Sequence, residues 1–111
     1  MAGVKRTKKA ATKDESVAPA LPANPTAPDA EVFRAGNGDV YHSYRELADA
    51  LDTMTPAVWQ HHVGEGRHDF AAWIQGVFHD QELADRIRAA TSQRHAQVII
   101  YRTMLERMTR S

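Results

Sequence analysis

A run of apolar residues in the second half of the chain restricts the fold more than any other feature. The run recurs at intervals of three and four residues and consists of Phe70, Trp73, Ile74, Val77 and Phe78. An α-helix places residues with this spacing on one face, and so large an apolar face must be covered by other elements. The spacing predicts a helix that begins near Asp69 and forms the centre of one hydrophobic core.

Two more helices are predicted before this one. The Ser-Tyr-Arg-Glu run at residues 43–46 has the form of a capping box, in which serine and glutamate bond free amides at a helix start. This helix is expected to run to about Asp52. The Thr-Pro pair at residues 55–56 repeats the start signal, and the helix that follows is expected to end at Gly64 or Gly66.

Two helices are also predicted after the central one. Asp80 and Glu82 place acidic groups on the first turn of a fourth helix, where the helix dipole favours them. Thr91 or Ser92 is expected to cap a fifth helix that covers about residues 92–109.

The fifth helix carries more apolar residues than one buried stripe needs. One row recurs by three and four and consists of Val98, Tyr101, Leu105 and Met108. Ile99, Ile100 and Met104 widen the apolar sector beyond that row. We therefore predict that the row is a contact surface for a protein partner or for a second copy of the chain.

The first thirty residues differ in composition from the rest. They consist mostly of Ala, Lys, Thr and Pro and contain no aromatic residue, so they cannot bury enough apolar surface to offset the entropy of ordering. Residues 1–30 are therefore predicted to be a disordered tail, first basic and then Ala/Pro-rich. Residues 31–111 are predicted to form one small domain.

A short β-hairpin is expected at the start of this domain. Residues 32–35 and 40–42 flank a Gly-Asn-Gly-Asp turn, and Asn-Gly is a strong hairpin signal. Two strands this short are marginal alone, so they must pack on the helices. The predicted fold class is mainly α, with this hairpin followed by a compact bundle of about five short helices.

Basic residues are concentrated in the tail although the formal net charge of the chain is zero. Residues 1–13 contain no acidic residue and hold Lys5, Arg6, Lys8, Lys9 and Lys13. Lysines on a flexible arm bind phosphates without requiring a fold, and a solubilising terminus is the other interpretation. The alternative function is thus a nucleic-acid-associated protein, in which the last helices assist with Arg86, Arg88, Arg94, Arg102, Arg107 and Arg110.

The sequence also argues against several classes of protein. It contains no cysteine, so disulfides, thiolate zinc sites and cysteine nucleophiles are excluded. No stretch approaches the roughly 20 apolar residues of a membrane-spanning helix. We expect a cytoplasmic protein that does not enter the membrane.

Histidines are clustered around the start of the central helix. The stretch contains His61, His62, His68, Asp69 and His79, but no His-x-x-x-His pair places two imidazoles on one helical face. No serine, threonine or second carboxylate lies nearby in sequence to complete a catalytic arrangement with His62 and Asp69. We predict no metal site, no cofactor and no enzymatic activity, and interpret Asp69 as a cap or first-turn residue.

The same stretch carries a local motif. It reads His-Val-Gly-Glu-Gly-Arg-His-Asp-Phe-Ala-Ala-Trp-Ile over residues 62–74 and is followed by Val77-Phe78 and Leu83-Ala84. It resembles a family of small bacterial and archaeal helical domains of unknown function, marked by His-Val, a short basic stretch, Asn-Asp-Phe and then Trp-Ile. Gly64 and His68 stand where asparagine is usual in that family.

The resemblance covers about residues 32–90 and leaves out the tail and the last helix. It implies a compact, mostly helical module with no established reaction. We interpret His62, Asp69, Phe70 and Trp73 as a structural motif. A glycine-containing turn separates His62 from Asp69, so the chain can bring the two together and align two helices around Trp73.

Overall fold

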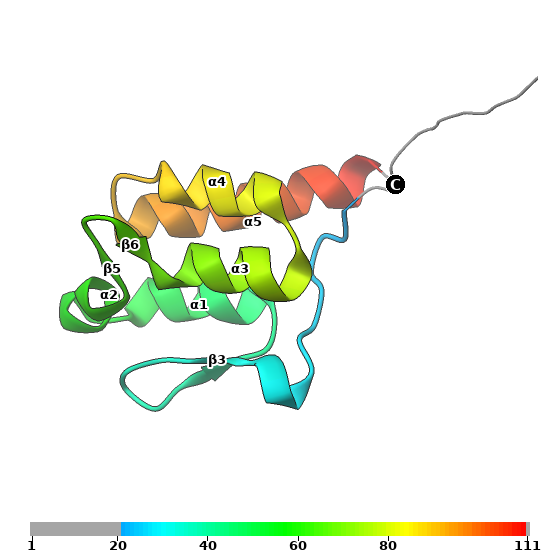
Figure 1. Ribbon diagram of the computed structural model, residues 1–111. Helices are drawn as coiled ribbons and strands as arrows, with labels where there is room; N and C mark the ends of the chain where they lie inside the picture. Colours follow the sequence, from blue (N-terminus) through cyan, green and yellow to red (C-terminus); the bar gives the residue numbers. More distant parts are fainter. Residues whose placement is uncertain (1–20, 111) are drawn as a thin grey trace, which may run out of the picture.

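The computed structural model describes residues 21–110. In chain order the elements are η1 (Asp29–Glu31), β3 (Phe33–Arg34), β4 (Val40–Tyr41), α1 (Tyr44–Thr53), α2 (Pro56–His62), β5 (Val63–Gly64), β6 (Arg67–His68), α3 (Asp69–Phe78), α4 (Gln81–Arg88) and α5 (Gln93–Arg110). The predicted fold class is confirmed, because a short hairpin precedes five α-helices in this part of the chain (Figure 1).

The first hairpin forms where the Gly-Asn-Gly turn predicts it. The Ala35 amide donates to the Asp39 carbonyl at 2.9 Å, and Gly38 has a φ of 94°. A three-residue loop of this kind needs one residue at positive φ, which glycine supplies without strain. Phe33 lies opposite Tyr41 in the antiparallel pair, and its ring centroid is 4.8 Å from that of Phe70. The hairpin is thereby packed against α3.

The start signals of α1 and α2 act as the sequence predicts, with one difference. The Ser43 hydroxyl accepts a hydrogen bond from the Glu46 amide at 3.2 Å, and the Thr55 hydroxyl accepts one from the Val58 amide at 3.3 Å. The Glu46 carboxylate accepts from the amide of His42 at 2.7 Å. In a capping box the glutamate accepts from the backbone amide of the N-cap residue, here Ser43. In this protein it accepts from the amide one residue earlier.

The predicted end of the second helix at Gly64 or Gly66 is wrong. Helix α2 ends at His62, and the chain then forms a second short hairpin in which Val63 pairs with His68. Gly66 has a φ of 74°, a left-handed conformation that glycine adopts readily and that reverses the chain. The hairpin leads directly into α3.

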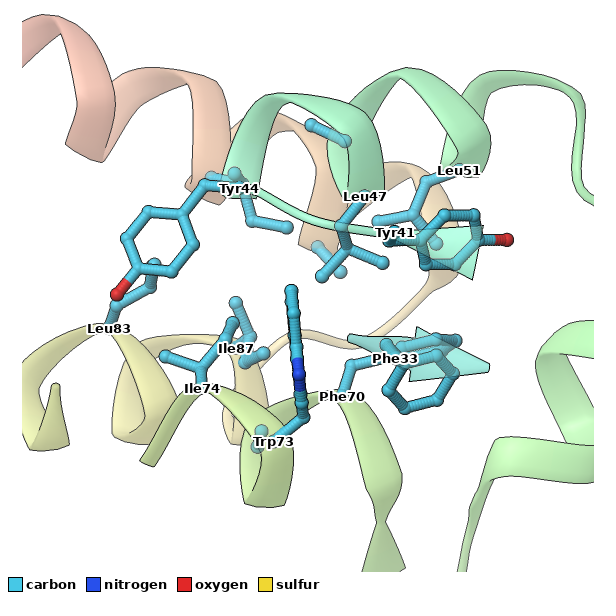
Figure 2. Close-up of a cluster of buried hydrophobic side chains, with 14 of the residues drawn as sticks. Phe33, Tyr41, Tyr44, Leu47, Leu51, Phe70, Trp73, Ile74, Leu83 and Ile87 are labelled. Carbon is cyan, nitrogen blue, oxygen red and sulfur yellow. The ribbon is translucent and has the colours of Figure 1, made fainter. Parts of the chain in front are cut away.

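One core lies between the helices. Helix α1 packs on α5, α3 packs on α4, and α4 packs on α5. In Figure 2 the Trp73 ring extends from α3 toward α1, and Tyr44 and Leu47 enter the same cluster from α1. The predicted apolar face of the central helix is at the core, since Phe70, Trp73 and Ile74 are buried and Val77 and Phe78 pack partly buried against them.

The predicted boundary between tail and domain at residue 30 is also wrong. Ala27 is only 3 % exposed, and its amide donates to the His42 carbonyl at 2.6 Å. Thr26 forms a β-bridge with Ser43, and Asp29–Glu31 is a 3-10 helix. Alanine can be buried in a core without belonging to a run of large apolar residues, so the sequence pattern did not predict this contact. Residues 1–20, which hold the rest of the predicted tail, lie outside the described residues.

Within residues 21–110, no helix combines the length and the apolar character needed to cross a membrane.

Candidate functional site

Helix α5 has two faces with different surroundings. Its buried face consists of Ala96, Gln97, Ile100, Thr103, Met104 and Arg107. The row predicted as a contact surface lies on another face, where Val98 is 38 %, Leu105 62 % and Met108 60 % exposed, while Tyr101 is half-buried. The protein's own core therefore uses one face of α5 and leaves most of the apolar row on the other face at the surface.

Two glutamines hold α5 against α1. The side-chain amide of Gln93 donates to the carbonyls of Leu51 and Met54 at 2.8 and 2.7 Å. The Gln97 amide donates to the Ala48 carbonyl at 3.0 Å. The carbonyls of Leu51 and Met54 lie at the end of α1, where carbonyls lack helical partners, so the two Gln93 bonds satisfy them. Because residue numbers rise along α5 as they fall along α1, the two helices are antiparallel.

A groove runs between these two helices beside the exposed row. Its volume is about 420 Å³, and it is lined by Arg45, Asp49, Tyr101, Met104, Leu105 and Met108. The Tyr101 hydroxyl donates to Asp49, and this bond, with partial burial, raises the pKa of the tyrosine. The Arg45 guanidinium lies 3.6 Å from the Asp49 carboxylate. We refer to Val98, Tyr101, Leu105 and Met108 together with Arg45 and Asp49 as the α1/α5 face.

A buried ion pair fixes the C-terminal part of α5. Arg107 donates to both carboxylate oxygens of Asp80, at 2.6 and 3.1 Å, and both side chains are only 2 % exposed. The Tyr44 hydroxyl donates to the same carboxylate at 2.7 Å. Burial alone raises the pKa of Asp80, but the hydrogen bonds from Arg107 and Tyr44 outweigh it and hold that pKa below its ordinary value. The guanidinium also donates to the Pro22 carbonyl at 3.3 Å.

This pair was not predicted from the sequence. Asp80 was predicted in the first turn of α4 and is instead its N-cap, whose carboxylate accepts from the Leu83 amide at 3.1 Å, and Arg107 was predicted on a basic surface. The second placement is wrong, because Arg107 is buried. Its position in the helix carried the signal: Arg107 follows Ile100 and Met104 by seven and three residues, which is the spacing of the buried stripe.

Most of the other arginines predicted to extend a basic surface lie beside carboxylates. Arg86 pairs with Glu82 and Glu106, Arg88 with Asp85, and Arg94 with Asp52, at distances between 3.0 and 3.8 Å. Arg102 is exposed. The side chain of Arg110 and the whole lysine-rich segment Lys5, Arg6, Lys8, Lys9 and Lys13 lie outside the described residues.

The structural motif brings His62 and Asp69 together. The imidazole Nε2 of His62 accepts from the Gly36 amide at 3.0 Å, which leaves the proton on Nδ1 to be donated to Asp69 at 3.0 Å. His62 therefore joins α2 to the first hairpin and to α3. Asp69 is a first-turn residue, and the cap of α3 is His68, whose Nδ1 accepts from the Ala71 amide at 3.3 Å.

We expect His62 and Asp69 to be energetically coupled. Replacing each by alanine, alone and together, should give a coupling of at least about 0.5 kcal/mol, as for residues in direct contact. The His62 variant alone should lose about 1–3 kcal/mol, because the Gly36 amide is left without its acceptor. Denaturant unfolding of the four proteins measures both values. Additive losses would show that the contact contributes nothing to stability.

A second pocket lies beside the β5–β6 hairpin. Its volume is about 500 Å³, and it is lined by Val63, Gly64, Gly66, Arg67, His68, Arg88 and Ala90. Its polar side chains have partners in the fold: Arg67 donates to the His61 carbonyl and Arg88 to the Gln75 side chain. Burial and the nearby Arg88 lower the pKa of His68, so this cap is neutral at neutral pH. These groups serve the local structure.

Of the other residues in this stretch, His61 and His79 are exposed and Trp59 is partly buried. The ring of His61 lies 4.7 Å from that of His62, and Trp59 stacks at 5.7 Å on Phe70. His79 follows α3 in a left-handed conformation. In the part of the chain that the structure describes, His, Asp and Glu side chains form no group of three that could hold a metal ion.

No family model, no curated protein and no solved structure matches the chain. The resemblance carried by residues 62–74 therefore stays a prediction.

Proposed function

We propose that the protein is a non-catalytic protein-interaction module and that the α1/α5 face is its contact surface. The observation that carries the proposal is the exposure of Leu105 and Met108 at 62 % and 60 % on a helix whose opposite side is already packed. Burying one such side chain completely is worth about 1.5–3 kcal/mol. A row of them at helical spacing is the usual feature by which one helix packs on another protein.

The surroundings of the row support the same function. Interfaces commonly have an apolar centre and a polar rim, and here Arg45 and Asp49 border the row on the α1 side. By contrast, the polar groups of the histidine-rich stretch bond to the fold itself, as His62 does to Gly36 and Asp69. That difference supports an interaction role over a catalytic one.

The nucleic-acid alternative receives less support from the described residues. In that alternative the lysine-rich arm binds phosphates and the arginines of the last helices assist, but Arg86, Arg88 and Arg94 each lie beside a carboxylate. Paired charges contribute little to the attraction of a polyanion. We therefore place the contact surface on α5 and α1.

Photo-crosslinking tests the proposal. A photoreactive amino acid in place of Leu105 should give covalent adducts with another polypeptide in living cells. The same amino acid in place of Glu65, exposed in the β5–β6 turn, is the control and should give far fewer. The proposal is wrong if position 105 gives no more adducts than position 65, or only adducts within its own chain.

A further inference from the structure

We infer that the pocket between the β5–β6 hairpin and the end of α4 is a binding site for the phosphate monoester group of a small molecule. The inference goes beyond the proposed function and does not depend on it, because this pocket shares no lining residue with the groove of the α1/α5 face. Its volume of about 500 Å³ is within the range of small-molecule sites. Figure 1 shows the hairpin at the end of the molecule where α4 leads into α5.

The described residues that line this pocket include two arginines and no carboxylate. Arg67 comes from β6, and Arg88 is the last residue of α4. A guanidinium donates to phosphate or carboxylate oxygens through parallel N–H groups. A phosphate monoester carries about 1.5 to 2 negative charges at pH 7, whereas a carboxylate or a phosphodiester carries one. Two guanidiniums therefore match the charge of a monoester best.

The Arg67 side chain is anchored by the fold and still has donors for a ligand. Its Nη2 donates to the carbonyls of Gln60 and His61 in the last turn of α2. A guanidinium has five N–H groups, and within residues 21–110 the Nε and Nη1 groups of Arg67 form no hydrogen bond. A side chain that is already held in place loses little freedom on binding. Arg67 is therefore preorganised to bind an anion.

Arg88 is anchored from α3 and α4. Its Nη2 donates to the Gln75 side chain at 2.7 Å, and its Nη1 donates to Asp85 at 3.2 Å. The Asp85 side chain is 62 % exposed, so solvent screens this pair and leaves much of the arginine's charge effective. That charge reaches the lining of the pocket, because together with burial it lowers the pKa of His68. An anion in the pocket is therefore attracted from both sides.

Gly64 keeps the space beside Arg67 open. The two residues are paired across the antiparallel hairpin, so a side chain at position 64 would lie on the same face as that of Arg67. A Cβ atom at Gly64 would meet no atom within 4 Å. Gly64 also lacks the positive φ that makes glycine the favoured residue at Gly66. The turn does not require a glycine at position 64, and its bare backbone leaves room for a ligand.

Titration followed by NMR tests the site in the full-length protein. Phenyl phosphate should shift the backbone amide signals of Gly64, Gly66 and His68 until they saturate. It should bind at least about tenfold more tightly than benzoate, which has the same ring and one charge. Inorganic phosphate should shift the same signals but bind more weakly, because it has no ring to contact Val63 and Ala90. A dinucleotide with only an internal phosphodiester should bind no better than benzoate.

Two variants with matched controls locate the binding. Gly64→Leu should fill the space beside Arg67 and abolish the binding of phenyl phosphate, with an unchanged melting curve. Gly76→Leu changes another exposed glycine with open space around it and should bind like the wild type. Arg88→Gln should weaken binding at least about tenfold. Arg102→Gln removes the same charge from an exposed position of α5 and should leave the affinity unchanged.

Three results would overturn the inference. The first is the lack of any saturable shift with phenyl phosphate. The second is an affinity for benzoate or the dinucleotide equal to that for phenyl phosphate, and the third is wild-type affinity in a folded Gly64→Leu or in Arg88→Gln. If circular dichroism shows that Gly64→Leu does not fold, the comparison of Arg88→Gln with Arg102→Gln decides alone. The Leu105 photo-crosslinks test the proposed function separately.

Discussion

Replacing Arg107 with methionine is expected to lower the free energy of unfolding by about 3–5 kcal/mol, because the change leaves Asp80 ionised and buried without its cation. The carboxylate is 2 % exposed and cannot turn to water. Methionine keeps much of the volume of the side chain, so the loss measures the charge more than the packing. The total free energy of unfolding of a small domain is about 5–15 kcal/mol. The expected loss is a large fraction of that total, so urea unfolding should detect it.

The pH dependence identifies the cause of that loss. The pKa of Asp80 in the folded protein lies below its ordinary value of 3.8. Its ion pair therefore contributes stability that is complete above about pH 3.8 and is lost as the pH falls through the folded-state pKa. Without the cation the buried carboxylate favours its protonated form, so the difference between wild type and variant should narrow in acid.

An exposed arginine of the same helix provides the control. Arg102→Met makes the same chemical change at an exposed position of α5 and should shift stability by no more than about 0.5 kcal/mol. An equal loss in both variants, or a difference that stays constant with pH, would show that the Asp80 pair is not responsible.

Trp73→Ala should cost about 3–5 kcal/mol, the range for truncating a buried aromatic side chain. The indole is 9 % exposed, and its ring centroid lies 5.8 Å from that of Phe33 and 5.2 Å from that of Phe78. Its Nε1 donates to the Glu31 carbonyl at 2.8 Å. One side chain thus joins α3, the first hairpin and the 3-10 helix before it.

Trp73→Phe separates the ring from its hydrogen bond. Phenylalanine keeps an aromatic ring in the core but cannot donate to Glu31, so most of the stability should remain, with a loss of about 1–2 kcal/mol. Chemical denaturation measures both variants, and hydrogen exchange should show faster opening around residues 29–34 in each. A cost below about 1 kcal/mol for Trp73→Ala would mean that the indole is not the centre of the core.

Local signals explain what the sequence could predict. The buried face of α3 follows from the spacing of its own apolar residues. Ser43 and Thr55 cap helices that begin at the next residue. Each of these features depends on neighbours in sequence, so periodicity and capping rules are sufficient. The exposed row of α5 was predicted for the same reason, since its spacing is independent of the rest of the fold.

The remaining features depend on contacts between distant residues. Arg107 and Asp80 are 27 positions apart, and only the docking of α5 on α4 and α1 makes them neighbours. The segment around Ala27 has no apolar periodicity that could reveal its burial. Arg45 and Asp49 read as ordinary exposed charges of one helix, and their place beside Tyr101 follows from the antiparallel packing of α1 on α5.

The hydrogen bond from Arg107 to the Pro22 carbonyl determines where the first residues of the chain join the domain. The same guanidinium bonds to Asp80, so one buried side chain holds both the start of α4 and the chain at Pro22 against the C-terminal part of α5. The first thirteen residues of the chain carry five basic and no acidic residues. The loss of Arg107 therefore removes the bond at Pro22, which lies next to the first described residue on the side of that basic segment, as well as the cation beside Asp80.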